Sequence, residues 1–280
     1  MSDKVVLITG ATGQQGGALA RALRGKGFKL RGLTRKPEGD GAKKLQELGV
    51  EVVQGDLDDV GSLNAALRGA WGVFGVQNTW EAGVEREEEQ GKRLARLARE
   101  AGVSHFVYAS VGSADENTGI PHFDNKARVE GVVRELGFAS HVIVRPVFFM
   151  ENVVGPGFSQ GDKLMTGLAP DTALQMVAVE DIGKVAAQAF VRSDALNGRE
   201  IDVAGDALSM TQVAKALSSQ LGKSIEFVSL PIDAVRKNSE DLALMLEWFE
   251  ATGYSADIPA LDAEFGRMLR FDDWVKKLPA

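Results

Sequence analysis

The sequence predicts an α/β fold with a doubly wound parallel sheet and a smaller, mostly helical C-terminal subdomain. Three observations predict it. An apolar β-branched run at 4–9 is followed by a turn with four glycines at 10–17 and a helical Ala/Leu/Arg run at 18–23. Short apolar runs then alternate with helical patterns through the first half of the chain. From residue 209 onward the pattern is mostly helical.

The glycine-rich turn at 10–17 is typical of a loop that binds a dinucleotide. Gly10 permits a tight turn after the strand, Gly13 lets backbone N–H groups approach a pyrophosphate, and Gly16 lets the helix pack closely on the strand. The pyrophosphate would then lie at the helix N-terminus. The spacing is G-x-x-G-x-x-G, which resembles the short-chain dehydrogenase/reductase superfamily, particularly its extended and atypical branches.

Length and composition limit the classes of function. With 280 residues, 44% of them hydrophobic, we expect one large domain with a smaller appendage. A net charge of −7 argues against nucleic acid or a membrane surface as the main partner. The chain has no cysteine, and its three histidines show no paired ligand spacing, so we expect no disulfide and no metal site. Without a leader or a long apolar run, we expect a soluble, cytoplasmic protein.

The end of the second expected strand, at 29–34, indicates which cofactor is bound. NAD-selective folds usually carry Asp or Glu here to bind the ribose 2′-hydroxyl, whereas a 2′-phosphate requires a cation. This chain has Arg35, with Lys36 beside it. We therefore predict that NADP(H) is preferred over NAD(H). The alternative is a solvated Arg35 before a proline turn.

The next two strand ends supply polar groups for the same ligand. The third expected strand, at 50–54, leads into Asp56, which could accept from the adenine amino group, and Leu57, which could cover the ring. For Asp58 and Asp59, a role as N-cap of a helix at 60–67 has nearly the same weight as a contact with the cofactor. The fourth expected strand, at 71–76, is followed by three polar residues that we expect at the ribose or nicotinamide: Gln77, Asn78 and Thr79.

A charged helix is expected after the fourth strand, with acidic residues at 85–89 and basic residues at 92–99. This order suits the helix dipole, and we expect most of these charges on a solvated face. Lys92 is the exception, because its long side chain could reach back to the cofactor.

The fifth expected strand, at 106–110, and the helix after it carry the candidate catalytic residues. Ser110 stands where short-chain dehydrogenases place a serine that polarises the substrate carbonyl. Those enzymes then use a Tyr-x-x-x-Lys pair, in which the lysine holds the ribose and lowers the pKa of the tyrosine. Here Lys126 is present, but His122 replaces the tyrosine. His122 is either a proton donor or a loop histidine that caps the helix.

The rest of the chain is expected to complete the two domains. A sixth strand at 140–146 precedes a short strand and helix at 175–186 and a returning strand at 200–204. We predict a dinucleotide-binding domain at 1–150, to which 176–205 returns. Residues 151–175 and 206–280 would form the subdomain for a small apolar substrate or a protein partner.

Together, seven blocks of residues resemble the NmrA-like family. The block His-Phe-Asp-Asn-Lys, at 122–126, makes the resemblance specific, whereas the glycine loop alone would indicate only the superfamily. The resemblance covers almost the whole chain. The blocks lie at 10–17, 34–37, 54–59, 122–126, 149–152, 179–186 and 271–274.

This resemblance implies a Rossmann domain that binds NADP and a small α/β substrate domain, often without the catalytic tyrosine. It implies either a sensor or transcriptional co-regulator that responds to the nicotinamide pool, or a reductase of the quinone or isoflavone type. Phe149, Met150, Glu151 and Asn152 would close over the nicotinamide. The other implied cofactor contacts are Gly10, Thr12, Gly13, Gln14, Gln15, Arg35, Asp56, Leu57, Gln77, Asn78, Thr79, Lys92 and Lys126.

Two functions therefore stay open. An intact cofactor site beside an altered catalytic pair favours a nucleotide sensor that presents a changed surface to a partner. An NADPH-dependent reductase would instead use Lys126 or His122 as the proton donor. A nucleotide-sugar epimerase or dehydratase is disfavoured because it needs a tyrosine at position 122.

Overall fold

The computed structural model describes residues 4–155 and 157–278, which form two compact units. Unit 1 comprises Met1–Val111, Asp124–Arg145 and Ile182–Ile201. Unit 2 comprises Gly112–Phe123, Pro146–Asp181 and Asp202–Ala280. The chain leaves unit 1 after the fifth strand and returns to it twice, with residues 124–145 and 182–201. The domain boundaries drawn from the sequence stay a prediction.

A seven-stranded sheet forms the centre of unit 1, in the order β11-β6-β5-β4-β1-β2-β3. Its pairings among β1 to β6 are all parallel. This confirms the predicted doubly wound sheet, and the expected returning strand is β11, beside β6. The strands are β1 (Val5–Ile8), β2 (Lys29–Thr34), β3 (Glu51–Gln54), β4 (Ala70–Gly75), β5 (His105–Ala109), β6 (Ser140–Pro146) and β11 (Glu200–Val203).

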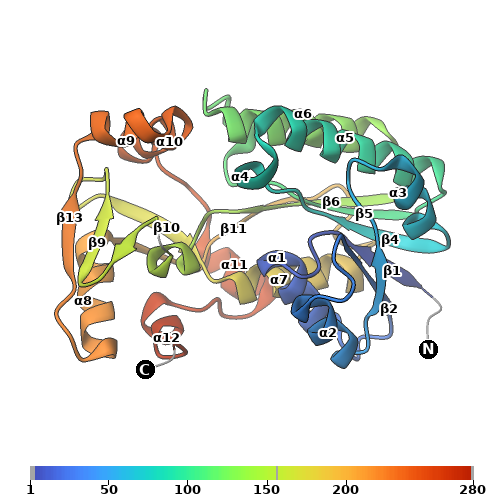
Figure 1. Ribbon diagram of the computed structural model, residues 1–280, viewed down its shortest axis with the longest axis horizontal. Coiled ribbons are helices and arrows are strands. Elements are labelled where there is room, and N and C mark those ends of the chain that lie inside the picture. The colour runs from blue at the N-terminus through green and yellow to red at the C-terminus, as the bar shows by residue number, and fades with distance from the viewer. Residues whose placement is uncertain (1–3, 156, 279–280) are drawn as a thin grey trace. The chain divides into compact units, whose positions relative to one another are not determined.

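Helices cover both faces of this sheet (Figure 1). One face carries α1 (Gln14–Leu23), α2 (Asp40–Glu47) and α7 (Val179–Val191), and the other carries α3 (Val60–Leu67), α5 (Val84–Glu100) and α6 (Pro121–Glu135). Because the central strands are buried on both faces, their sequences are nearly continuous apolar runs. Leu7, Val73, Leu94 and Val133 have no exposed surface and belong to the core beneath α5 and α6.

Unit 2 contains two three-stranded sheets, in the orders β12-β10-β7 and β13-β9-β8. Their strands are β7 (Phe148–Phe149), β8 (Ser159–Gln160), β9 (Lys163–Thr166), β10 (Ala173–Val177), β12 (Asp206–Ser209) and β13 (Glu226–Ser229). The helices are α8 (Met210–Leu221), α9 (Ile232–Asn238), α10 (Glu240–Ala251), α11 (Ile258–Phe265) and α12 (Phe271–Val275). The C-terminal part is thus mostly helical, as predicted.

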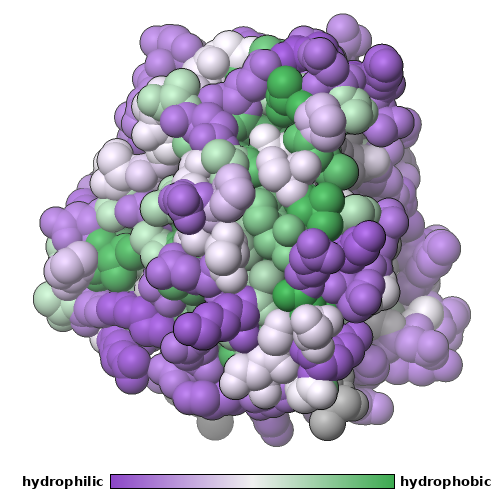
Figure 2. Space-filling model, turned by 90° about the vertical axis from the view of Figure 1, so that its left-hand side faces the viewer, coloured by the Kyte–Doolittle hydropathy of each residue, from purple (hydrophilic) through white to green (hydrophobic). Residues whose placement is uncertain are grey.

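The surface of unit 2 is unevenly polar. Figure 2 shows a band of hydrophobic residues between hydrophilic ones on the face toward the viewer. Val154, 42% exposed, is a large hydrophobic side chain on the surface of this unit. None of the helices formed by residues 4–155 and 157–278 is both long and apolar enough to cross a membrane.

Candidate functional site

The carboxyl ends of β1 and β4 are fixed beside each other in unit 1. The Thr9 hydroxyl lies 3.2 and 3.0 Å from the carbonyl oxygens of Phe74 and Val76, to which it donates. It also accepts the N–H of Val76 at 2.8 Å. In open α/β sheets, ligands bind at this edge. These hydrogen bonds therefore fix the backbone from which the predicted ligand residues after β1 and β4 extend.

The glycine turn after β1 has the geometry that its sequence predicted. Gly10 has φ +55°, a conformation that favours glycine. A Cβ on Gly16 would lie 2.4 Å from the carbonyl oxygen of Gly10, so α1 packs against the turn more closely than a side chain allows. Gly13, the N-cap of α1, offers no side-chain acceptor to the first helical N–H groups. An anion at this N-terminus would satisfy those groups.

Three side chains near this edge hold buried polar atoms without a hydrogen-bond partner among the described residues. Gln77, 8% exposed, leaves both its amide nitrogen and its amide oxygen unpaired. Ser110, 3% exposed, leaves its hydroxyl unpaired, and Gln15 leaves Oε1. Each unpaired buried polar group costs about 1–3 kcal/mol, so native proteins rarely leave one. The amide, ribose and phosphate groups of a dinucleotide offer the missing partners, and the residues therefore fit such a cofactor.

Arg35 and Lys36 follow β2 and are both exposed. The guanidinium of Arg35 forms an ion pair with Glu81, in the short helix α4 (Thr79–Ala82). The backbone N–H of Lys36 donates to the hydroxyl of Thr34 at 3.2 Å. Arg35 thus has a carboxylate partner that the sequence analysis did not expect.

The three aspartates of the acidic loop after β3 have different hydrogen-bond partners. Asp59 is the N-cap of α3 and accepts the N–H of Gly61 at 2.9 Å, as the capping hypothesis predicted. Asp58 is no cap, because its carboxylate accepts from three side chains of α5: Arg86, Gln90 and Arg93. These hydrogen bonds outweigh the burial that would raise the pKa of Asp58, and its pKa is lowered. Asp56 accepts the N–H of Asp58 at 3.0 Å.

A buried carboxylate lies between the predicted cofactor residues of α4 and α6. Glu87, 1% exposed, accepts from the Lys126 ammonium at 2.7 Å and from the Asn125 amide at 2.9 Å. The hydroxyl of Thr79 also donates to it. Burial would raise the pKa of Glu87, but the charge of Lys126 and these hydrogen bonds outweigh it and lower the pKa. Lys126 is thus held as one half of an ion pair with a side chain that is 12% exposed.

Two other predicted cofactor residues have partners of their own. Asn78 is the N-cap of α4 and accepts the N–H of Trp80 at 3.1 Å. Lys92 pairs with Glu88 one turn earlier on α5, and Glu88 also accepts from Arg128 at 2.7 Å. The cofactor roles of Asn78 and Lys92 stay predictions, and these contacts define the positions of both side chains without a ligand.

His122 and its partners lie in unit 2. His122 is the second residue of α6, and its backbone N–H donates to Asp241 at 3.1 Å. The Nδ1 atom of its ring contacts the other oxygen of the same carboxylate. Asp241 stands in the first turn of α10, where a carboxylate suits the helix dipole. His122 is therefore a buried helix residue with an acidic partner and not a loop histidine.

Neither tyrosine stands at the place of His122. Tyr108 is buried in the core of unit 1, and burial raises its pKa well above the usual value. Tyr254 belongs to unit 2 and stacks with Phe123, with ring centroids 6.3 Å apart and planes 14° apart. Burial raises the pKa of Tyr254 as well.

The segment expected to close over the nicotinamide, Phe149 to Asn152, lies in unit 2 and has a structural role there. Met150 has no exposed surface. Glu151 accepts the N–H of Val179 at 3.1 Å and the indole N–H of Trp274 at 3.0 Å. Burial raises the pKa of Glu151. Glu151 thus joins the start of α7 to the C-terminal segment.

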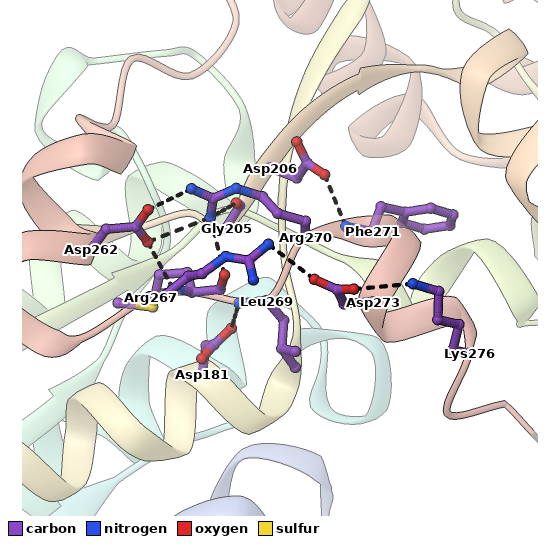
Figure 3. Close-up of polar contacts among 11 residues, drawn as sticks. Asp181, Gly205, Asp206, Asp262, Arg267, Leu269, Arg270, Phe271, Asp273 and Lys276 are labelled. Atoms are coloured by element: carbon purple, nitrogen blue, oxygen red, sulfur yellow. Dashed lines mark hydrogen bonds and ion pairs between the residues drawn. The ribbon is translucent and has the colours of Figure 1, made fainter.

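The same C-terminal segment is held by further polar contacts within unit 2 (Figure 3). The Arg270 guanidinium donates to the carbonyl oxygen of Gly205 at 2.7 Å and pairs with Asp262. The N–H of Leu269 donates to Asp181 at 2.7 Å. These contacts hold the segment before α12 against Asp181, Gly205 and Asp262.

Sequence reasoning missed the acidic partners of the candidate site. We expected most charges of helix α5 on a solvated face, but Glu87 is buried. A signal was present: Glu87 lies four and seven residues before Gly91 and Leu94, which are buried on the same side of α5. Asp241 is more than a hundred residues from His122, and no local pattern joins them. Among the described residues, no group of three or more His, Asp or Glu could hold a metal ion.

The chain matches the NmrA-like family over residues 2–270, and it belongs to that family. A relative from Streptomyces griseus, a (4-alkanoyl-5-oxo-2,5-dihydrofuran-3-yl)methyl phosphate reductase, is 33% identical over 236 residues. That match covers 83% of this chain and 79% of the relative.

Solved structures show the same fold. The structure of NmrA, a negative transcriptional regulator, in complex with NAD has a TM-score of 0.82 at 21% identity and covers 99% of this chain and 96% of its own. NmrA has also been solved with NADP. A triphenylmethane reductase from Citrobacter sp., complexed with NADP(H), has a TM-score of 0.81 at 19% identity, with 98% and 99% covered. The structural neighbours thus bind both NAD and NADP.

Proposed function

We propose that this protein binds NADP(H) at the carboxyl edge of the unit 1 sheet and uses it to reduce a small electrophilic substrate. The observation that carries the proposal is the buried amide of Gln77, which has no partner among the described residues and lies two residues beyond the end of β4. The uncapped start of α1 supplies an anion site in the same unit. The names of the relatives favour a reductase.

Each part of the dinucleotide has candidate partners in unit 1. The pyrophosphate would bind the first N–H groups of α1, and Arg35 would bind the 2′-phosphate. Asp56 and Leu57 would contact the adenine. Lys126 would donate to the nicotinamide ribose from the position in which Glu87 holds it.

Reduction of a C=C or C=O bond requires one hydride, which the reduced nicotinamide supplies when bound, and one proton. Lys126 is the candidate proton donor in unit 1, because only one of its three N–H bonds is directed at Glu87. His122 is the second candidate. Replacing each in turn, by Lys126→Met and His122→Gln, identifies the donor through the pH dependence of the rate that is left.

Gln77→Leu tests the cofactor site. Leucine removes two unpaired polar atoms at similar volume, so the free energy of unfolding should be unchanged or slightly higher. NADP⁺ affinity should nevertheless fall by about tenfold, the size of one lost hydrogen bond to a buried amide. Titration calorimetry measures the affinity, and urea denaturation measures the stability. A variant that loses stability but keeps its affinity would show that Gln77 is structural.

A redox sensor is the second candidate, favoured by the tight pairing of Lys126 with Glu87 and by the neighbour named as a negative transcriptional regulator. The two functions differ in turnover. An enzyme should oxidise NADPH with an electrophile such as a small quinone at more than about 1 per second. If the protein binds NADPH but turnover with a panel of electrophiles stays far below that rate, the sensor is favoured.

A further inference from the structure

The ion pair between Arg35 and Glu81 occupies the place where the proposed function puts a 2′-phosphate. Arg35 directly follows β2, and Glu81 belongs to α4, 46 residues later in the chain. Both side chains are more than half exposed, at 59% and 53%. A guanidinium binds a carboxylate and a phosphate through the same N–H groups, so the two anions compete for it.

The other charges near Glu81 have partners of their own. The guanidinium of Arg86 is held by Asp58, and this hydrogen bond, together with the charges of Asp58, Asp56 and Glu81, raises its pKa. Arg35 is therefore the cation for which Glu81 and a phosphate would compete. With Glu81 in place, the same phosphate also meets a negative charge.

Helix α4, which carries Glu81, is short. It has four residues and lies between Asn78, its N-cap, and Gly83, whose φ is +84°. Exposed ion pairs contribute little to stability, so displacing Glu81 lowers affinity by about fivefold at most.

We infer that Glu81 is a specificity-determining residue that weakens the preference for NADP(H) over NAD(H) by competing with the 2′-phosphate for Arg35. This inference rests on the proposed dinucleotide site. A 2′-hydroxyl does not compete with Glu81 and can donate a hydrogen bond to its carboxylate. The wild-type protein therefore binds NADP⁺ and NAD⁺ with a smaller difference in affinity than Arg35 alone would produce.

The test is to measure NADP⁺ and NAD⁺ affinities for the wild-type protein and for Glu81→Gln by titration calorimetry. Glutamine keeps the size of the side chain and removes its charge. We expect the ratio of NADP⁺ to NAD⁺ affinity to rise by about three- to fivefold in the variant, mostly through tighter NADP⁺ binding. The increase should shrink in 0.5 M salt, because exposed charges are screened.

Glu85→Gln is the matched control, because Glu85 is exposed in the first turn of α5 and the substitution changes the net charge equally. It should leave the ratio unchanged. An unchanged ratio in Glu81→Gln, or an equal rise in Glu85→Gln, would overturn the inference while leaving the dinucleotide site intact. If the wild-type protein binds neither nucleotide, the proposed function fails, and the inference fails with it.

Discussion

At the scale of single residues, the buried carboxylate of Glu87 organises the candidate site of unit 1. It accepts from Lys126 and Asn125 on α6 and from Thr79 on α4. A buried charge is tolerated only when it is paired and hydrogen-bonded, and Glu87 has both kinds of partner. Lys126, which the sequence predicted as a site residue, is therefore positioned by Glu87, which it did not predict.

Replacing Glu87 should destabilise the protein through Lys126. Glu87→Gln leaves a mostly buried ammonium without its counter-charge, and we expect the free energy of unfolding to fall by about 2–4 kcal/mol. The double variant Glu87→Gln/Lys126→Met removes both charges and should recover part of that loss. Urea denaturation at pH 7 measures all three proteins. If the double variant is no more stable than Glu87→Gln, the ion pair is not the cause.

The stabilisation by Glu87 should also depend on pH. The pKa of Glu87 is lower in the folded protein than its ordinary value of 4.5, so the unfolded chain binds more protons. The stabilisation is therefore complete above the ordinary value and is lost as the pH falls through the folded pKa. The stability difference between the wild-type protein and Glu87→Gln should shrink when urea denaturation is repeated below pH 4.5. A difference that stays constant down to pH 3 would contradict this assignment.

At the scale of elements, the glycine turn positions α1 by close backbone contact. The G-x-x-G-x-x-G spacing predicted this contact, because Gly16 must lack a side chain where α1 packs on the turn. The short strands of unit 2 were harder to predict. β8 has two residues and β9 and β13 have four each, which is too short for alternation of polar and apolar residues to stand out.

The contrast between two helical glycines tests this account of α1. Gly16→Ala places a Cβ 2.4 Å from a backbone oxygen, and we expect it to cost about 3 kcal/mol or more and to weaken NADP⁺ binding. Gly131→Ala, in α6, meets no atom within 4 Å and should stabilise the protein by about 0.5–1 kcal/mol. Thermal denaturation separates the two outcomes. Equal effects of both substitutions would remove the argument for close packing.

Two arginines of the C-terminal segment should likewise differ in their importance for unit 2 (Figure 3). Arg270 donates to two backbone carbonyl oxygens and pairs with Asp262, so Arg270→Ala should cost about 1–3 kcal/mol. Arg267, 70% exposed, pairs with Asp273 on the surface, and Arg267→Ala should cost less than about 0.5 kcal/mol. Melting temperatures of both variants provide the comparison. A larger loss for Arg267→Ala would mean that the segment is anchored in another way.

At the scale of the whole molecule, the sequence predicted the sheet and the family because both depend on local patterns. Apolar runs mark strands buried on two faces, and the glycine turn marks the first helix. The pairing of Arg35 with Glu81, and of His122 with Asp241, could not be predicted in this way. Those contacts depend on how distant segments of each unit fold together, and local spacing contains no information about them.

The central claim is that the carboxyl edge of the unit 1 sheet binds NADP(H). Hydrogen exchange, measured by mass spectrometry with and without saturating NADPH, tests it most directly because it locates the ligand along the chain. We expect slower exchange in peptides covering 10–17 and 76–81. Peptides that cover β2 up to residue 34, or β3 up to residue 54, should exchange at an unchanged rate. No protection at 10–17, or protection only in unit 2, would contradict the claim.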